Sequence, residues 1–207
     1  VDKLDKNKTV FTKEQLKTSG FEGVIEELVW NETKTKVLVY TNSKKVWRAN
    51  TKGDYWCFDL ETGKGKQLGA NLEKSSLMFA KFSSDNENVA YVSKHNIYIE
   101  NLNSGKITSL TTDGTDKIIN GTFDWVYEEE LAARDGFRWS PDGKSIAFWR
   151  VDATETKFHL MINNTDALYP FIVPVEYPKA GEKPSSVKIG VIDVASLKTN
   201  WLNIPGE

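Results

Sequence analysis

The chain has 207 residues, of which 39% are hydrophobic, and a formal net charge of -2. This length and apolar content fit one globular domain or a large part of one. The near-neutral charge and the lack of any basic run argue against nucleic acid as a partner, because proteins bind phosphates through clustered Lys and Arg. No run of about 18 apolar residues occurs, so we expect no membrane-spanning helix.

Residues suited to metal or redox chemistry are scarce. Cys57 is the only cysteine, so no intrachain disulfide can form. The only histidines, His95 and His159, are far apart in the chain, and we expect each at a surface or strand edge. We therefore predict no metal site and no cofactor. The polar, charged segment 1–14 does not resemble a signal peptide.

The segment 13–27, which precedes the first predicted strand, is mostly polar. A few apolar residues are scattered through it and just before it, among them Phe11, Leu16 and Phe21. This pattern is compatible with a short helix or with a lead-in strand, and both alternatives stay open.

Three segments that resemble one another then follow along the chain. Each has an aromatic residue, a polar turn, and a run of β-branched and aromatic residues, starting near Trp30, Phe82 and Trp139. The third turn, 140–143, has the sequence Ser-Pro-Asp-Gly, in which proline presets φ at one position and glycine supplies a positive φ at another. A second predicted hairpin follows each segment. Its turn has six residues in a fixed order of types: an acidic or amide residue, an apolar residue, two variable residues, Gly or Leu, and Lys.

Units of about four short strands that repeat at this spacing are typical of propeller blades. We predict an all-β fold, a partial β-propeller of about three four-stranded blades of an expected eight. The units are 24–70, 77–112 and 136–204, and the insertions 115–135 and 152–186 interrupt them. Insertions on loops often carry binding groups. A β-sandwich with coincidental similarity is the alternative from the pattern alone.

The first insertion contains an acidic run. Asp124 suits a helix N-cap, and we expect a short helix whose second turn carries three glutamates at 128–130. Trp125 and Tyr127 are large enough to anchor this helix. A charge run is usually a solvated face. The functional alternative is a pocket for a cationic group, either an amine or a metal ion, although the spacing does not fit a calcium-binding EF-hand loop.

Several motifs resemble dipeptidyl peptidase IV and its relatives in the prolyl oligopeptidase clan. They are Asp-Trp-Val-Tyr-Glu-Glu-Glu at 124–130, Arg-Trp-Ser-Pro-Asp-Gly at 138–143, and Glu-Tyr-Pro-Lys-Ala-Gly at 176–181. The segment 161–166 is more similar to bacterial members of the family than to animal ones. The resemblance is strong from about Leu77 to Leu202 and weak before that.

The resemblance implies an N-terminal eight-bladed propeller, a C-terminal α/β-hydrolase domain, and removal of Xaa-Pro or Xaa-Ala dipeptides from peptides with a free N-terminus. It implies that Glu129 and Glu130 bind the substrate's ammonium, whose three donors suit paired carboxylates. Neighbouring residues are expected to support these two: Asp124, Trp125, Tyr127 and Glu128.

One family feature is absent from this sequence. The animal enzymes hold the substrate carbonyl with a propeller arginine, but the comparable stretch 69–76 contains none. Lys74 offers a point charge without the planar fork of arginine. Arg134 is another possible candidate, and its alternative role is an ion pair with Asp135 or a nearby glutamate.

The chain contains no Gly-x-Ser-x-Gly motif, so we predict no catalytic residue in it. We expect a fragment whose partners are the missing hydrolase domain, the remaining blades and peptide substrates. Open blade edges predict homo-oligomers. The resemblance implies a periplasmic or extracellular location. Two alternatives remain: a non-catalytic propeller that binds or acts as a scaffold, and an unrelated propeller lectin or interaction module.

Overall fold

The computed structural model describes residues 9–205. Segments 1–8 and 206–207 lie outside the described residues. Most of segment 1–14, which was compared with a signal peptide, therefore lies outside them too. The described residues form fifteen strands and two six-residue helices, which confirms the all-β prediction. The chain divides into two compact units, Val1–Phe82 and Ser83–Glu207. Within the described residues no helix has the length and apolar character needed to cross a bilayer.

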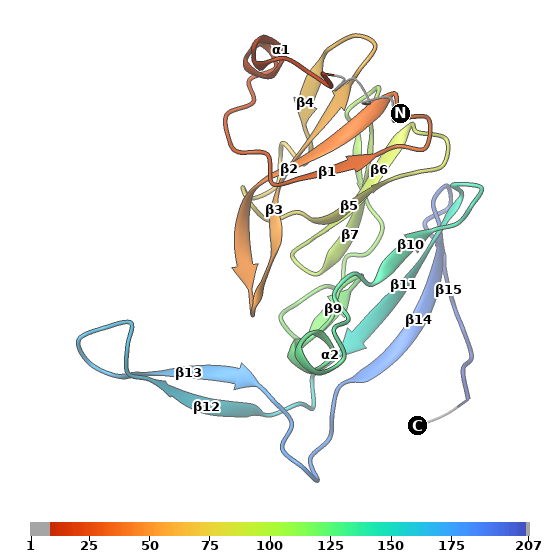
Figure 1. Cartoon of the computed structure of the whole chain (residues 1–207). Helices are drawn as coiled ribbons and strands as arrows, with labels where there is room; N and C mark the ends of the chain where they lie inside the picture. The colour runs from red at the N-terminus through yellow and green to blue at the C-terminus, as the bar shows by residue number, and fades with distance from the viewer. Residues whose placement is uncertain (1–8, 206–207) are drawn as a thin grey trace, which may run out of the picture. The chain divides into compact units, whose positions relative to one another are not determined.

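The first unit contains one helix and five strands (Figure 1). Their bounds are α1 (Lys13–Thr18), β1 (Glu27–Trp30), β2 (Lys36–Val46), β3 (Ala49–Asp59), β4 (Gly65–Gln67) and β5 (Met78–Phe82). The helix α1 resolves the alternatives left open for segment 13–27. Thr12 Oγ1 accepts a hydrogen bond from the Gln15 N–H at 3.2 Å, and Gln15 Oε1 accepts one from the Thr12 N–H at 2.7 Å. This reciprocal capping box stabilises the start of a helix that has no fully buried residue.

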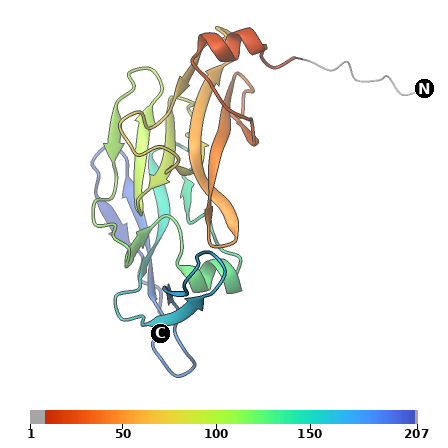
Figure 2. The same cartoon turned by 90° about the vertical axis from the view of Figure 1, so that its left-hand side faces the viewer.

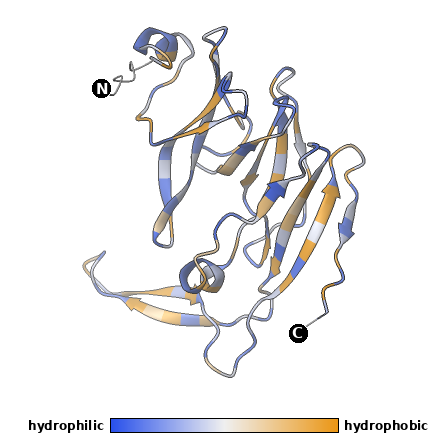
Figure 3. Ribbon diagram, turned by 45° about the vertical axis from the view of Figure 1, so that its right-hand side comes forward, coloured by the Kyte–Doolittle hydropathy of each residue, from blue (hydrophilic) through white to orange (hydrophobic). Residues whose placement is uncertain are grey.

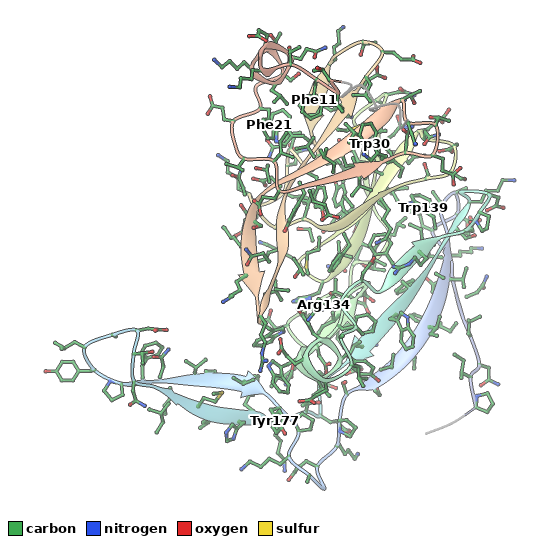
Figure 4. All side chains as sticks on the ribbon, in the orientation of Figure 1. Phe11, Phe21, Trp30, Arg134, Trp139 and Tyr177 are labelled. Carbon is green, nitrogen blue, oxygen red and sulfur yellow. The ribbon has the colours of Figure 1, made fainter. Side chains whose placement is uncertain are left out.

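The strands β1 to β4 pair in sequence order as an antiparallel sheet. Residues 37–41 of β2 are all buried, so this strand is covered on both faces. One face holds a cluster of Phe21, Val37, Val39 and Phe58, and the ring of Phe11 stacks on Phe58 at 5.3 Å. Figure 4 labels Phe11 and Phe21 on the segments that flank α1. Covered faces on both sides are expected for a sheet that packs between other layers.

The second unit contains ten strands and one helix. Their bounds are β6 (Asn88–Ser93), β7 (Asn96–Asn101), β8 (Ile107–Ser109), β9 (Ile118–Asn120), α2 (Trp125–Glu130), β10 (Phe137–Trp139), β11 (Ser145–Asp152), β12 (Phe158–Asn163), β13 (Phe171–Glu176), β14 (Ser186–Asp193) and β15 (Thr199–Trp201). Strands β6, β7 and β8 pair in that order. Strands β10, β11, β14 and β15 form a second antiparallel sheet. The blade boundaries 24–70, 77–112 and 136–204 stay a prediction.

Both predicted insertions contain strands that the sequence analysis did not foresee. Strand β9 pairs with β11, from Ile118 opposite Asp152 to Asn120 opposite Arg150, so this sheet has five strands rather than the expected four. Strands β12 and β13 pair only with each other. We call this hairpin, residues 158–176, the arm.

The arm projects from the rest of the second unit and is coloured largely as hydrophobic (Figures 1 and 3). Most of its apolar side chains are exposed, with Leu160 at 60% and Ile162 at 67%, whereas Val175 is buried. A two-stranded ribbon has no second layer to cover its faces, so exposure follows from the geometry.

The three predicted hairpin turns of the acidic-apolar pattern share one set of hydrogen bonds. In each, a side-chain oxygen accepts from the backbone N–H and the hydroxyl of the residue three positions later. The pairs are Asp59 with Thr62, Asn101 with Ser104, and Asp193 with Ser196. The next residue has a positive φ: 68° at Gly63, 71° at Gly105 and 59° at Leu197. The repeated sequence pattern is therefore a repeated turn geometry.

Candidate functional site

The helix α2 begins at Asp124, as the sequence predicts. The Asp124 backbone is extended, with φ -79° and ψ -178°, and its Oδ1 accepts a hydrogen bond from the Tyr127 N–H at 3.1 Å. Asp124 is only 4% exposed. A carboxylate at this position accepts a hydrogen bond from a helix N–H group that has no partner within the helix. Its negative charge also interacts favourably with the positive end of the helix dipole.

Aromatic contacts attach α2 to two other parts of the second unit. The Tyr127 ring stacks on Phe123 at 5.5 Å, and Phe123 lies 5.7 Å from Trp149 of β11. Trp125 packs edge-on against Tyr177, with ring centroids 5.1 Å apart. The helix is thus held between β11 and the base of the arm.

The three glutamates have different environments. Glu128 is buried and closes the first turn of α2, not the second as expected, whereas Glu129 is half-buried and Glu130 is exposed. Burial raises the pKa of the Glu128 carboxyl, the positive charge of Arg134 opposes that rise, and the neighbouring Glu129 adds to it. Only the last two glutamates reach the surface.

Arg134 pairs with the buried glutamate. Its Nε lies 3.4 Å from Glu128 Oε1, and Figure 4 shows Arg134 beside α2. Asp135 pairs instead with Arg138, whose Nη1 lies 2.9 Å from Asp135 Oδ1. Of the two roles considered for Arg134, the geometry supports the ion pair with a nearby glutamate.

The surface of α2 near its end carries negative charge. Glu129 and Glu130 are the last two residues of the helix, and its last turn contains no basic residue. The C-terminal end of a helix is itself negative and favours cations. An arriving cation would therefore be stabilised here by the helix end and by two carboxylates.

A hollow of about 550 Å³ beside α2 is bordered by Phe123, Tyr127 and Trp149 and by Arg134. A second hollow of about 250 Å³ is lined by residues of β10, β11 and β14, among them Phe137, Phe148 and Ile189. Neither of these two hollows is lined by Glu129 or Glu130. Glu130 is exposed, whereas Glu129 is half-buried and its Oε1 is shielded from solvent.

One contact at α2 has no signal in the sequence. Ser185 Oγ donates a 2.7 Å hydrogen bond to Asp124 Oδ2, across 61 positions of the chain. Tyr177, which contacts Trp125, lies within the motif 176–181, but the motif alone does not reveal this contact.

Two further residues named in the sequence analysis, Lys74 and His159, are exposed. Lys74 is an exposed residue of the first unit. His159 is exposed on β12 and lies 6.3 Å from the Tyr177 ring. Between residues 9 and 205 no group of three His, Cys, Asp or Glu side chains has a metal-binding arrangement.

Comparison with known proteins agrees with these features. A family model described as "Dipeptidyl peptidase IV (DPP IV) N-terminal region" matches residues 31–207. The probable dipeptidyl-aminopeptidase B of Arthroderma otae is 31% identical over 215 residues, which cover 98% of this chain and 23% of that protein. The corresponding protein of Arthroderma gypseum is 34% identical over 186 residues, which cover 84% of this chain and 20% of that protein.

Solved structures show the same fold. The crystal structure of Porphyromonas gingivalis dipeptidyl peptidase 4 matches with a TM-score of 0.86 at 30% identity, over 97% of this chain and 28% of that chain. The chain thus spans less than a third of the length of each of these relatives. The predicted partial β-propeller is confirmed, and the chain belongs to the dipeptidyl peptidase IV family, matching the N-terminal β-propeller region.

Proposed function

We propose that this chain is the substrate-recognition part of a dipeptidyl peptidase IV-like serine exopeptidase that releases Xaa-Pro and Xaa-Ala dipeptides. In this proposal Glu129 and Glu130 bind the free N-terminal ammonium of the peptide. The observation that carries it is the placement of both carboxylates at the negative end of α2, with no basic residue in the last turn. Peptides with a free N-terminus outside the cytoplasm are the proposed substrates.

The chemistry of the site suits an ammonium. An ammonium has three donors, and each carboxylate can accept a charge-assisted hydrogen bond from it. Successive helix residues are turned by about 100°, so with Glu128 directed into the fold its two neighbours project away from that side. The repulsion between the carboxylates falls when the cation binds, which adds to the affinity.

The test is the double substitution Glu129→Gln/Glu130→Gln in the complete gene product. Loss of two charge-assisted hydrogen bonds should lower kcat/KM for a free-amine Xaa-Pro substrate by about a hundredfold or more. Hydrolysis of the same substrate with an acetylated amine should start low and remain unchanged, because that substrate has no cation to bind.

The matched control is Glu32→Gln/Glu61→Gln, which removes the same charge from two exposed glutamates of the first unit. This control should retain wild-type kcat/KM. Unchanged kcat/KM in the Glu129→Gln/Glu130→Gln variant would refute the amine site. In that case a propeller that only binds or acts as a scaffold becomes the better account.

A further inference from the structure

We infer that Ser185 and Tyr177 are positioning residues that hold α2, and through it Glu129 and Glu130, in place. Both belong to the segment 177–185 between β13 and β14, which we call the return loop. This inference rests on the proposed function, because it assigns a role in orienting the same two carboxylates. The base of the arm, where the return loop begins, lies beside α2 in Figures 1 and 2.

A six-residue helix cannot hold its own geometry. Isolated helices shorter than about 12 residues are marginal in water, so tertiary contacts must keep α2 folded and oriented. The pair of Glu128 and Arg134 supplies one such contact near its C-terminal end. Tyr127 supplies a second through Phe123, which lies against Trp149 of β11. The return loop supplies further contacts at the N-terminal end.

Asp124 is the point at which the return loop holds the helix. One oxygen of its buried carboxylate caps α2 through the Tyr127 N–H, and the other accepts from Ser185 Oγ at 2.7 Å. A buried carboxylate is stable only when its oxygens are hydrogen-bonded. The Ser185 hydroxyl thereby fixes the direction of the carboxylate that starts the helix.

Tyr177 adds a second contact. Its ring meets Trp125, the first residue of α2, edge to face at an interplanar angle of 77°. Its backbone N–H donates to Lys157 O at 3.2 Å, which ties the residue to the start of β12. Figure 4 shows Tyr177 at the base of the arm. The loop thus sets both the cap and the first side chain of the helix.

Because the helix is short, the contacts at its N-terminal end also affect the positions of the two carboxylates at its C-terminal end. Glu130 lies about 8 Å along the axis from the helix start, at about 1.5 Å per residue. A small rotation of the N-terminal turn therefore moves Glu129 and Glu130 relative to a bound ammonium.

The experiment compares Ser185→Ala with Ser186→Ala in the complete gene product. Ser186 is the adjacent exposed serine, so its substitution is a matched control. We expect Ser185→Ala to raise KM for a free-amine Xaa-Pro substrate by about three- to tenfold, with kcat within about twofold, because binding and not chemistry is weakened. Ser185→Thr keeps the hydroxyl and should restore KM.

A second readout separates positioning from general damage to the fold. The rate of labelling by a small fluorophosphonate, which carries no amine, should be the same in Ser185→Ala and wild type. Tyr177→Leu should raise KM in the same way, and Tyr177→Phe, which keeps the ring, should not. These variants test the loop even where Ser185→Ala folds poorly.

Two results would overturn the inference. If Ser185→Ala and Tyr177→Leu keep wild-type KM while Glu129→Gln/Glu130→Gln loses activity, the proposed function stands and the positioning role is wrong. If labelling and kcat fall together with substrate binding, the two residues serve the fold only. Wild-type activity of the Glu129→Gln/Glu130→Gln variant would instead refute the amine site itself.

Discussion

Arg134 Nε lies 3.4 Å from Oε1 of Glu128, so a positive charge compensates the first of three consecutive glutamates inside the fold. Glu128 is 3% exposed, whereas the side chain of Arg134 is 35% exposed. The pair connects α2 to the segment that follows it. Glu129 and Glu130 are the two glutamates of the run that reach the surface.

Arg134→Ala should destabilise the fold more at pH 8 than at pH 4. Burial raises the pKa of Glu128 above its usual value of 4.5, so stability already falls as pH rises from that value through the folded pKa. Arg134 opposes this rise in pKa, and its removal makes the fall larger. At pH 8 we expect a loss of about 1–2 kcal/mol, less than for a fully buried pair.

Urea denaturation of the chain at the two pH values measures this difference. Arg138→Ala is the control, because Arg138 forms an exposed pair with Asp135. It should change the free energy of unfolding by less than about 0.5 kcal/mol at either pH. An equal loss for Arg134→Ala at pH 4 and pH 8 would contradict a role for the Glu128 charge.

Leu197→Gly should stabilise the third of the repeated turns. Leu197 has a φ of 59°, a conformation that strains a residue with a side chain, whereas glycine occupies the same place in the other two turns. We expect a gain of about 1 kcal/mol from removal of the strain, partly offset by the flexibility of glycine in the unfolded chain.

The reverse substitution, Gly105→Ala, tests the same strain with no change in packing. A Cβ at Gly105 would have no atom within 4 Å, so the positive φ alone should cost about 1 kcal/mol. Thermal unfolding of both variants gives the comparison. A destabilised Leu197→Gly would show that the half-exposed leucine side chain contributes more than its backbone costs.

Asp193 should titrate below its usual pKa because of its turn. The hydroxyl and then the N–H of Ser196 hydrogen-bond to the carboxylate and hold its pKa below 3.8. A lowered pKa means that this contribution to stability is present above pH 3.8 and is lost as pH falls through the folded value. Carboxyl NMR titration should show the pKa rising towards 3.8 in Ser196→Ala. Ser104→Ala, in the turn where Asn101 replaces the acid, should leave it unchanged.

Lys117→Met should loosen the arm. The Lys117 ammonium donates to Thr156 O at 2.8 Å, pairs with Glu176, and lies 4.2 Å from the Phe158 ring centroid, so it holds both strands at the base of the arm. Burial raises the pKa of the Glu176 carboxyl, and Lys117 opposes the rise. The variant therefore also leaves the Glu176 carboxylate without the positive charge of Lys117.

Hydrogen exchange measures the effect on β12 and β13. Loss of about 1–1.5 kcal/mol of local stability corresponds to roughly tenfold faster exchange. Lys183→Met removes a charge from an exposed pair with Glu155 and should not change the exchange of the arm. Wild-type exchange rates in Lys117→Met would show that the pairing between the two strands suffices.

Much of the fold could be predicted from the sequence because its determinants are local. The β-branched run at 36–40 became the start of β2, and the Ser-Pro-Asp-Gly turn has Gly143 at a φ of 68°. The helix at 13–18 was also predictable, since Thr12 and Gln15 have the spacing of a capping box, although the scattered apolar pattern left the choice open.

The arm could not be predicted from apolar periodicity. Strand β12 is exposed on both faces, so it lacks the alternation that a half-buried strand shows. Strand β9 was missed because three residues are too short for a periodic signal, and only its pairing with β11 defines it.

The sequence by itself determined the acidic helix: Asp124 caps it, and the run of glutamates places two carboxylates at its end. Only the tertiary structure decided which glutamate is buried and which residues hold the helix. Capping depends on neighbours within one turn, where spacing along the chain specifies geometry. The contact between Ser185 and Asp124 spans 61 positions, and no local rule specifies a pair that only the folding of the intervening arm brings together.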